Sequence, residues 1–165
     1  MATETFMVGV VVERRVAVSP WIEHAWLPVA VLPGVPDLPP WSSLGHEGTT
    51  ERFYAGAVAM ELHRTDTATY RDNLASGTPR MWIACRPAED APLAIRFVTP
   101  DPAEGEAYTE AGDDIVEAVP MPSEIAALLA AFIAAHHVER PFLKRQRDRA
   151  GPAGPHRRPA LEDDE

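Results

Sequence analysis

The sequence predicts an α+β protein with a mostly antiparallel sheet of about six strands, three helices and a disordered C-terminal tail. Strand-like runs follow one another at the N-terminus before the first helical signal. The later elements do not alternate regularly between strand and helix, which argues against a doubly wound parallel sheet. Seventeen prolines among 165 residues, about double the usual share, indicate many loops. We expect a single α+β domain over residues 1–141, with helices on one face of the sheet, and a basic then acidic flexible tail over 142–165.

The first three strands are predicted from short runs rich in β-branched residues. Residues 6–15 are apolar on both alternating faces, which is typical of a central strand. A second strand covers 27–32, where Pro28 predicts an edge or a bulge because proline cannot donate to the ladder. Residues 33–48 predict a surface loop, since they contain four prolines and three glycines. The third strand covers 51–63, whose small residues indicate close packing or a bulge.

The middle of the chain predicts a short helix and a hairpin. Thr65 or Asp66 provides a capping side chain at the start of the helix, and Gly77 marks its end. Two strands follow at 80–86 and 93–99, and their spacing suits a hairpin with a longer loop.

The second helix has clear boundaries in the sequence. Asp101 is a predicted N-cap, Pro102 suits the first turn, and Gly112 supplies the stop. A short strand over 115–119 then leads into a rigid proline turn at 120–122.

The last helix is predicted over residues 123–139, with Ser123 as its N-cap and Pro141 as the residue that prevents its continuation. Its apolar residues recur at helical spacing and form one stripe. Burying five such side chains, at about 1.5–3 kcal/mol each, should dock the helix firmly. The residues of the stripe are Ile125, Leu128, Leu129, Phe132, Ile133 and His136.

Charge is divided sharply along the chain. Residues 1–139 carry eight Arg against twenty Asp and Glu, a net charge of −12, whereas residues 140–160 carry a net +6. A cationic segment on an acidic body predicts binding to a protein partner, since the body would repel nucleic acid from all but that segment. The expected contacts are Arg140, Phe142, Lys144, Arg145, Arg147 and Arg149.

A second group of candidate contacts lies at the end of the first strand. Arg14 and Arg15 are followed in the sequence by Trp21 and Trp26. Arginine beside tryptophan can form cation–π surfaces, which recur at binding sites. The alternative is an ordinary strand end with salt-bridged arginines.

The pair His136 and His137 completes the predicted contact set. Neighbours on a helix lie roughly 100° apart, so the two rings cannot share a face. The main expectation for His136 is a core or subsurface histidine with a hydrogen-bond partner, and a metal-binding or catalytic role remains as an alternative. No metal site is predicted, because the usual His spacing is absent.

Other residues give little sign of catalysis. Cys85 is the only cysteine and predicts a buried, inert thiol. The acidic residues from Glu110 to Asp114 predict a solvated loop. Lys144 is the only lysine, and no phosphate-binding or nucleophile motif is present. We therefore expect a protein that is not an enzyme and has no cofactor.

The absence of a signal peptide or a long apolar run predicts a cytoplasmic protein without a membrane anchor.

Several strings resemble an uncharacterised bacterial family, a domain of unknown function, over residues 6–149. They are VGVVVERR, WLPVAVLPG, YRDNL, IVEAVPMP and HHVERPFLKRQRDR. Members of that family tend to be encoded beside formate dehydrogenase and its maturation factors, and some carry the label molybdopterin-guanine dinucleotide biosynthesis protein A. True guanylyltransferases begin with a glycine-rich loop, LxGGxSxRMGxDK, which is missing here, so we reject nucleotidyltransferase activity. The resemblance assigns no functional residue.

Three functions therefore remain open. The first is a non-catalytic accessory or assembly protein of a molybdenum-dependent formate dehydrogenase system, which binds a molybdoenzyme subunit or a maturation factor. The second is binding or handling of an anionic pterin or nucleotide cofactor. The third is a nucleic-acid-binding regulator acting through the basic tail.

Overall fold

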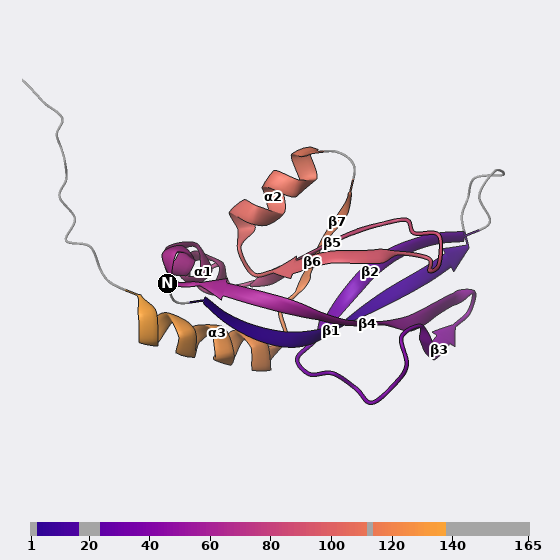
Figure 1. Cartoon of the computed structure of the whole chain (residues 1–165), viewed down its shortest axis with the longest axis horizontal. Helices are drawn as coiled ribbons and strands as arrows, with labels where there is room; N and C mark the ends of the chain where they lie inside the picture. Colours follow the sequence, from indigo (N-terminus) through magenta and orange to yellow (C-terminus); the bar gives the residue numbers. More distant parts are fainter. Residues whose placement is uncertain (1–2, 17–23, 112–113, 138–165) are drawn as a thin grey trace, which may run out of the picture.

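The computed structural model describes residues 3–16, 24–111 and 114–137, and these form two antiparallel sheets and three α-helices (Figure 1). The α+β class is therefore confirmed, although the described strands number seven and are divided between sheets of four and three. The elements in chain order are β1 Thr3–Val16, β2 His24–Leu32, β3 Ser42–Glu47, β4 Thr50–His63, a 3₁₀ turn Arg64–Asp66, α1 Thr67–Ala75, β5 Arg80–Arg86, β6 Ala94–Thr99, α2 Pro102–Ala111, β7 Ile115–Pro120 and α3 Ser123–His136.

Strand β1 lies inside the larger sheet, whose order is β2-β1-β4-β3. Its central position was predicted from the apolar residues on both faces, and Val8 through Val12 are all buried. The register between β1 and β2 shifts where Val12 lies opposite Pro28, so the predicted irregularity at this proline is confirmed. A second shift occurs near Gly56, whose φ of 121° is readily adopted only by glycine.

Strand β3 was missed in the sequence, because residues 33–48 were predicted to be a loop. The strand forms a tight hairpin with β4, in which Glu47 lies opposite Thr50 and Gly48 has a φ of 62°. Strand β3 contains no β-branched residue and includes Gly45, so its local preference for strand is weak. Pairing with the long strand β4 outweighs that weak preference.

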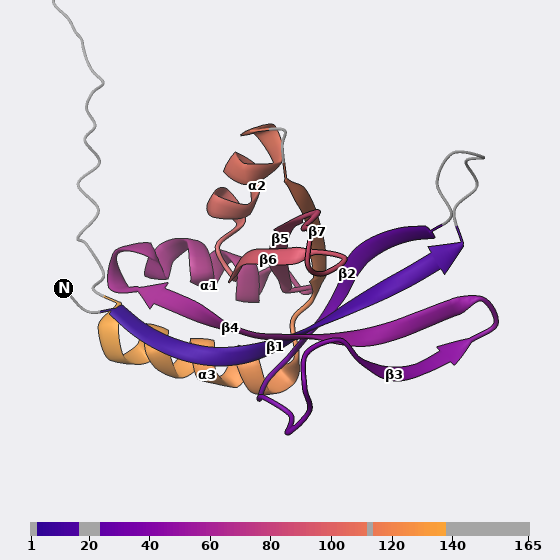
Figure 2. The same cartoon turned by 45° about the vertical axis from the view of Figure 1, so that its right-hand side comes forward.

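The smaller sheet has the order β6-β5-β7, and it packs against the larger sheet around one apolar core. Strand β6 lies beside β4 and strand β7 beside β2, so both sheets contribute their inner faces (Figure 2). Helix α3 adds three buried residues from its predicted stripe, and α1 adds a tyrosine. The core residues from the helices are Ile125, Leu129, Phe132 and Tyr70.

Helix α2 lies on the face of the smaller sheet that points away from the apolar core. Trp82 alternates with the core residues Met81 and Ile83 along β5, and its side chain lies directly against Gly105 of α2. The expectation that all helices share one face was therefore wrong. Gly105 allows the close approach, because it has no side chain between the helix backbone and the indole.

The helix caps follow the sequence only in part. The predicted cap of α2 is confirmed, since the backbone N–H of Ala103 donates a hydrogen bond to Oδ1 of Asp101 at 3.0 Å. Helix α1 begins after Asp66, but that carboxylate makes no capping hydrogen bond. A 3₁₀ turn precedes α1, and it gives Asp66 a backbone conformation outside the extended region that N-caps use.

Helix α3 starts and ends differently from the prediction. Pro122 is the N-cap residue and its carbonyl accepts the first helical hydrogen bond, from the N–H of Ala126 at 2.9 Å. Ser123 is therefore the first helical residue and not the cap. The helix ends at His136, because the backbone of His137 is extended, so the predicted continuation to residue 139 was wrong.

Candidate partner-binding site

An arginine held between aromatic rings lies at one end of the larger sheet. Arg14 of β1 lies opposite Trp26 of β2 and opposite Glu51 of β4. Its guanidinium carbon is 5.7 Å from the ring centroid of Trp26 and 5.3 Å from that of Phe53. One terminal nitrogen donates to Oε1 of Glu51 at 2.6 Å. The predicted contact between Arg14 and Trp26 is therefore present, and it includes a salt bridge.

Trp41 completes this aromatic group in a strained conformation. Its φ is 70°, and it is the only residue other than glycine with a positive φ in the part of the chain that the structure describes. For a bulky residue this left-handed conformation costs on the order of 1–3 kcal/mol, and such strain clusters at functional sites. The ring centroid of Trp41 lies 6.0 Å from the ring centroid of Trp26 and 6.4 Å from that of Phe53. The strained backbone thus places the indole against its two aromatic neighbours.

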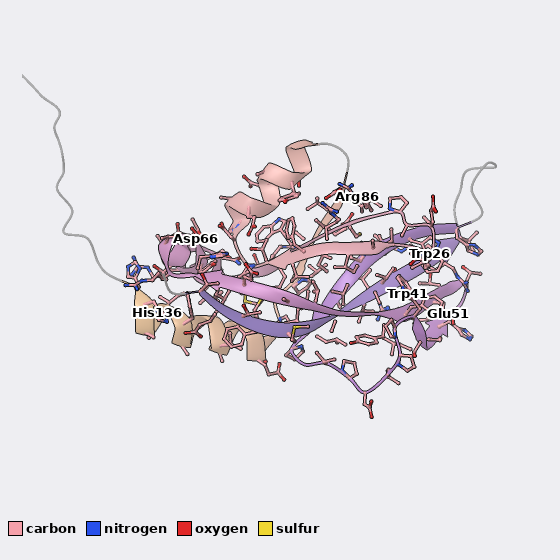
Figure 3. The ribbon with its side chains drawn as sticks, in the orientation of Figure 1. Trp26, Trp41, Glu51, Asp66, Arg86 and His136 are labelled. Atoms are coloured by element: carbon pink, nitrogen blue, oxygen red, sulfur yellow. The ribbon has the colours of Figure 1, made fainter. Side chains whose placement is uncertain are left out.

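We call this group the Arg14 cluster. Tryptophan and arginine are enriched where protein interfaces derive most of their binding energy. The guanidinium of Arg14 is already paired with Glu51, which also accepts a hydrogen bond from the hydroxyl of Ser43 at 2.6 Å. Such a group is suited to packing against another protein more than to capturing a free anion. Its members are Arg14, Trp26, Trp41, Ser43, Glu51 and Phe53. Figure 3 labels Trp26, Trp41 and Glu51.

Arg15 does not join the Arg14 cluster, because neighbouring side chains on a strand point to opposite faces. On the other face, Arg15 donates from Nε to Oε1 of Glu13 at 2.6 Å, and Arg52 of β4 donates from Nε to Oε2 at 3.0 Å. The Glu13 side chain is only 7% exposed. Burial alone would raise the pKa of Glu13, but the hydrogen bonds and charges of the two arginines outweigh it and lower that pKa below its ordinary value.

The lowered pKa of Glu13 makes stability depend on acid pH. A carboxyl group with a depressed folded-state pKa stabilises the protein above its unfolded-state pKa, and this contribution is lost as pH falls through the folded value. We expect Glu13→Gln to be destabilising at pH 7, and its difference from wild type to shrink below about pH 4.5. Urea unfolding of both proteins across pH 3 to 7 measures this difference. A difference that does not change with pH would contradict the ion-paired state of Glu13.

His136 and His137 hold the end of α3 against two other elements. Nε2 of His136 lies 3.0 Å from Oε2 of Glu4 in β1, and the imidazole packs on Phe132 with ring centroids 4.5 Å apart. Nδ1 of His137 lies 2.8 Å from the hydroxyl of Thr67 at the start of α1. The expected hydrogen-bond partner of His136 is therefore present. The two histidines therefore hold the C-terminal end of α3 in place against β1 and α1.

The predicted contact residues do not form one site. Figure 3 shows Trp26, Trp41 and Glu51 at one end of the molecule, and His136 at the other end. Trp21 and the predicted contacts of the basic segment lie outside the residues that the structure describes. Among the described residues, no group of three or more His, Cys, Asp or Glu side chains is placed to hold a metal ion.

The thiol of Cys85 is fully buried in the core, as predicted. Burial, together with the nearby negative charges of Asp114 and Glu117, raises the pKa of this thiol to about 12. The reactive species is the thiolate, so the native protein should resist iodoacetamide at pH 8. We expect labelling only after denaturation, as measured by intact mass. Rapid labelling of the native protein would show that Cys85 is accessible.

Asp114 does not lie in a solvated loop as predicted. Its side chain is 4% exposed, and Arg86 of β5 donates to Oδ1 from two nitrogens, Nε at 2.9 Å and a terminal nitrogen at 2.7 Å. Arg96 of β6 approaches Oδ2 at 3.9 Å. Neighbouring side chains on β5 point to opposite faces, so Arg86 points away from Cys85. The side chain of Arg86 instead reaches the start of β7. Asp114 thus joins all three strands of the smaller sheet.

These features define a small α+β protein of two sheets, with an arginine–aromatic group at one end and a helix fixed by histidines at the other. A family model described as "Protein of unknown function (DUF3305)" matches residues 7–146, and the chain belongs to this family. No curated protein and no solved structure matches the chain. None of the described helices combines the length and apolar character needed to cross a membrane.

Proposed function

We propose that this protein is a non-catalytic accessory or assembly protein that binds a protein partner through residues 140–149. The observation that carries the proposal is the separation of charge, with a net −12 over residues 1–139 and +6 over residues 140–160. Electrostatic complementarity of this kind guides association and selects partners. An acidic protein surface is the partner chemistry that a cationic segment with an aromatic residue, Phe142, would recognise.

The described body supports this proposal by fixing the origin of the basic segment. His136 and His137 bind β1 and α1, and Arg140 follows only three residues later. The first cationic residue of the segment is therefore close along the chain to the anchored end of α3, and a partner that binds the segment would approach this end of the molecule.

We further propose that the partner belongs to a molybdenum-dependent formate dehydrogenase system, as a subunit or a maturation factor. This finer assignment rests on the resemblance of strings such as VPMP and HHVERPFLKRQRDR. The Arg14 cluster favours protein binding over cofactor binding, because Glu51 already neutralises the guanidinium of Arg14.

Truncation tests the proposal. The native host would express the tagged full chain, a version ending at residue 139, and a control version ending at residue 149. We expect the full chain and the control to retain the same partner in affinity purification, and the shorter version to lose it. Circular dichroism should give equal melting temperatures for all three. Equal capture of the partner by the version ending at residue 139 would refute the proposal.

A further inference from the structure

The face of the larger sheet opposite the Arg14 cluster carries two arginines joined by one buried carboxylate. Glu13 lies between them, with one oxygen bound to Nε of Arg15 and the other to Nε of Arg52. Neither guanidinium has another hydrogen bond or ion pair with the part of the chain that is described. Their side chains are 51% and 60% exposed. Of the two, Arg52 also lines a cleft, where its terminal nitrogens are available to a ligand.

The charges of this group leave one positive charge uncompensated. Two guanidinium groups share a single carboxylate, and each uses only its Nε–H toward it. A guanidinium presents its N–H donors in a planar fork that matches a carboxylate or phosphate. A ligand with a single negative charge would neutralise the group. A dianion would instead place excess negative charge beside the buried Glu13.

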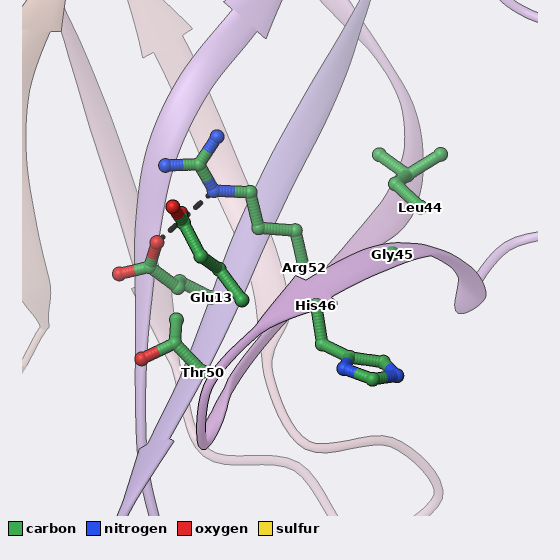
Figure 4. A pocket seen from close by; sticks show the side chains of 7 residues that line it. Glu13, Leu44, Gly45, His46, Thr50 and Arg52 are labelled. Carbon is green, nitrogen blue, oxygen red and sulfur yellow. Dashed lines mark hydrogen bonds and ion pairs between the residues drawn. The ribbon is translucent and has the colours of Figure 1, made fainter.

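A cleft of about 440 Å³, lined in part by Glu13 and Arg52, opens over β1 and the hairpin of β3 and β4 (Figure 4). Its lining offers three kinds of contact. Arg52 supplies donors to an anion, Glu47 supplies an acceptor for an N–H, and the exposed side chain of Leu44 supplies apolar surface. The hydroxyl of Thr50 adds a further polar group. Glu47 disfavours a bare anion such as phosphate, and it favours a ligand that also carries a hydrogen-bond donor.

We propose that this cleft binds a carboxylate-bearing peptide segment of the protein partner. The carboxylate would bind the terminal nitrogens of Arg52, a backbone N–H of the segment would donate to Glu47, and an apolar side chain would contact Leu44. The carboxylate can belong to an internal acidic side chain or to a chain terminus, which share the same chemistry. The inference rests on the proposed function, since it concerns a second contact with the same partner.

Peptide titration followed by NMR tests the cleft directly. The first two probes are a tetrapeptide blocked at both ends, with one internal glutamate next to leucine, and the same peptide with glutamine in place of glutamate. The next two are a peptide blocked only at its N-terminus, with a free C-terminal carboxylate, and its amidated form. Inorganic phosphate is the fifth probe. We expect saturable shifts of the Arg52 Nε–H resonance with at least one carboxylate peptide, and none with the glutamine or amidated peptides. The arm that binds identifies the source of the carboxylate. Equal or tighter binding of phosphate, or equal binding of the uncharged peptides, would overturn the proposal.

Variants connect the binding to the named residues. We expect Arg52→Gln to weaken peptide binding at least tenfold, and Arg64→Gln, an exposed control in the 3₁₀ turn that follows β4, to leave it unchanged. Because Arg52→Gln leaves Glu13 with one partner and could unfold the protein, Glu13→Gln is a second variant with the opposite expected sign. It removes the competing carboxylate and should tighten binding several-fold. Unchanged affinity in the folded variants would contradict the assignment.

The same titration separates the cleft from the proposed function. The version ending at residue 139 keeps the cleft and should bind the peptides like the full chain. If the peptides fail to bind while that truncation still abolishes partner capture, the accessory function stands and the cleft assignment falls. If the peptides bind but truncation leaves capture unchanged, the role of the basic segment falls instead.

Discussion

Replacing Asn73 with leucine is expected to lower the free energy of unfolding by about 3 kcal/mol, because three backbone groups would lose a hydrogen-bond partner, at about 1 kcal/mol each. Asn73 of α1 is buried, and its Nδ2 donates to the carbonyls of Arg80 and Pro100 at 2.8 and 2.9 Å. Its Oδ1 accepts from the N–H of Arg80 at 3.0 Å. One side chain thus joins α1, the start of β5 and the segment before α2.

The reason for this dependence lies in the sheet. Arg80 and Pro120 of β7 face each other without mutual hydrogen bonds, since the N–H of Met121 donates to the carbonyl of Pro79 instead. The N–H and carbonyl of Arg80 therefore point toward the β6 side, where β6 has already ended at Thr99 opposite Trp82. The amide of Asn73 supplies the partners that β6 cannot. Urea unfolding monitored by circular dichroism measures the loss, with Asp72→Asn as an exposed control on the same helix that should change stability by no more than about 0.5 kcal/mol. A loss below about 1 kcal/mol for Asn73→Leu would contradict this role.

Gly105→Ala is expected to destabilise the protein by roughly 2 kcal/mol or more, although alanine favours a helix by about 1 kcal/mol over glycine. A Cβ at this position would lie 2.3 Å from Cγ and 2.8 Å from Cβ of Trp82. These atoms are close to the backbone of β5 and cannot move without displacing the strand. Helix α2 would therefore have to separate from the sheet.

Two controls make the expectation for Gly105 specific. Gly34→Ala introduces a Cβ with no atom within 4 Å and should leave the melting temperature nearly unchanged. In a Trp82→Ala background, Gly105→Ala should lose a large part of its destabilising effect, because Cγ and the indole ring are gone and only the contact with Cβ, at 2.8 Å, remains. Additive effects of the two substitutions would show that the clash with Trp82 is not the cause.

Elements whose signals are local were predicted well from the sequence. The N-cap Asp101, the hairpin of β5 and β6 and the central strand β1 depend on residues near one another in the chain. Strand β3 could not be predicted in this way, because its pairing is determined by β4 and not by its own weak preference. The only local signal of a hairpin in this part of the sequence was Gly48, three residues before the predicted start of the next strand at residue 51.

Only part of the Arg14 cluster was predicted from the sequence, namely the two residues that lie at the adjacent ends of consecutive strands. Arg14 and Trp26 face each other across neighbouring strands, so sequence proximity identified them. Glu51 and Phe53 come from a strand whose register with β1 contains a bulge, which no local pattern reveals. The burial of Glu13 was missed for a related reason, since Arg52 reaches it from 39 residues away.

Neutralising the basic segment tests the central claim most directly, because it removes charge without shortening the chain. A variant would carry glutamine at all five cationic positions of residues 140–149, and a control variant would carry Arg157→Gln and Arg158→Gln. Affinity purification from the native host with quantitative mass spectrometry, at low and high salt, compares both with the wild type. We expect the wild type and the control to recover an acidic protein that is lost at high salt, and the neutralised variant to recover none of it. Equal recovery by the neutralised variant, or recovery indifferent to salt, would contradict the account.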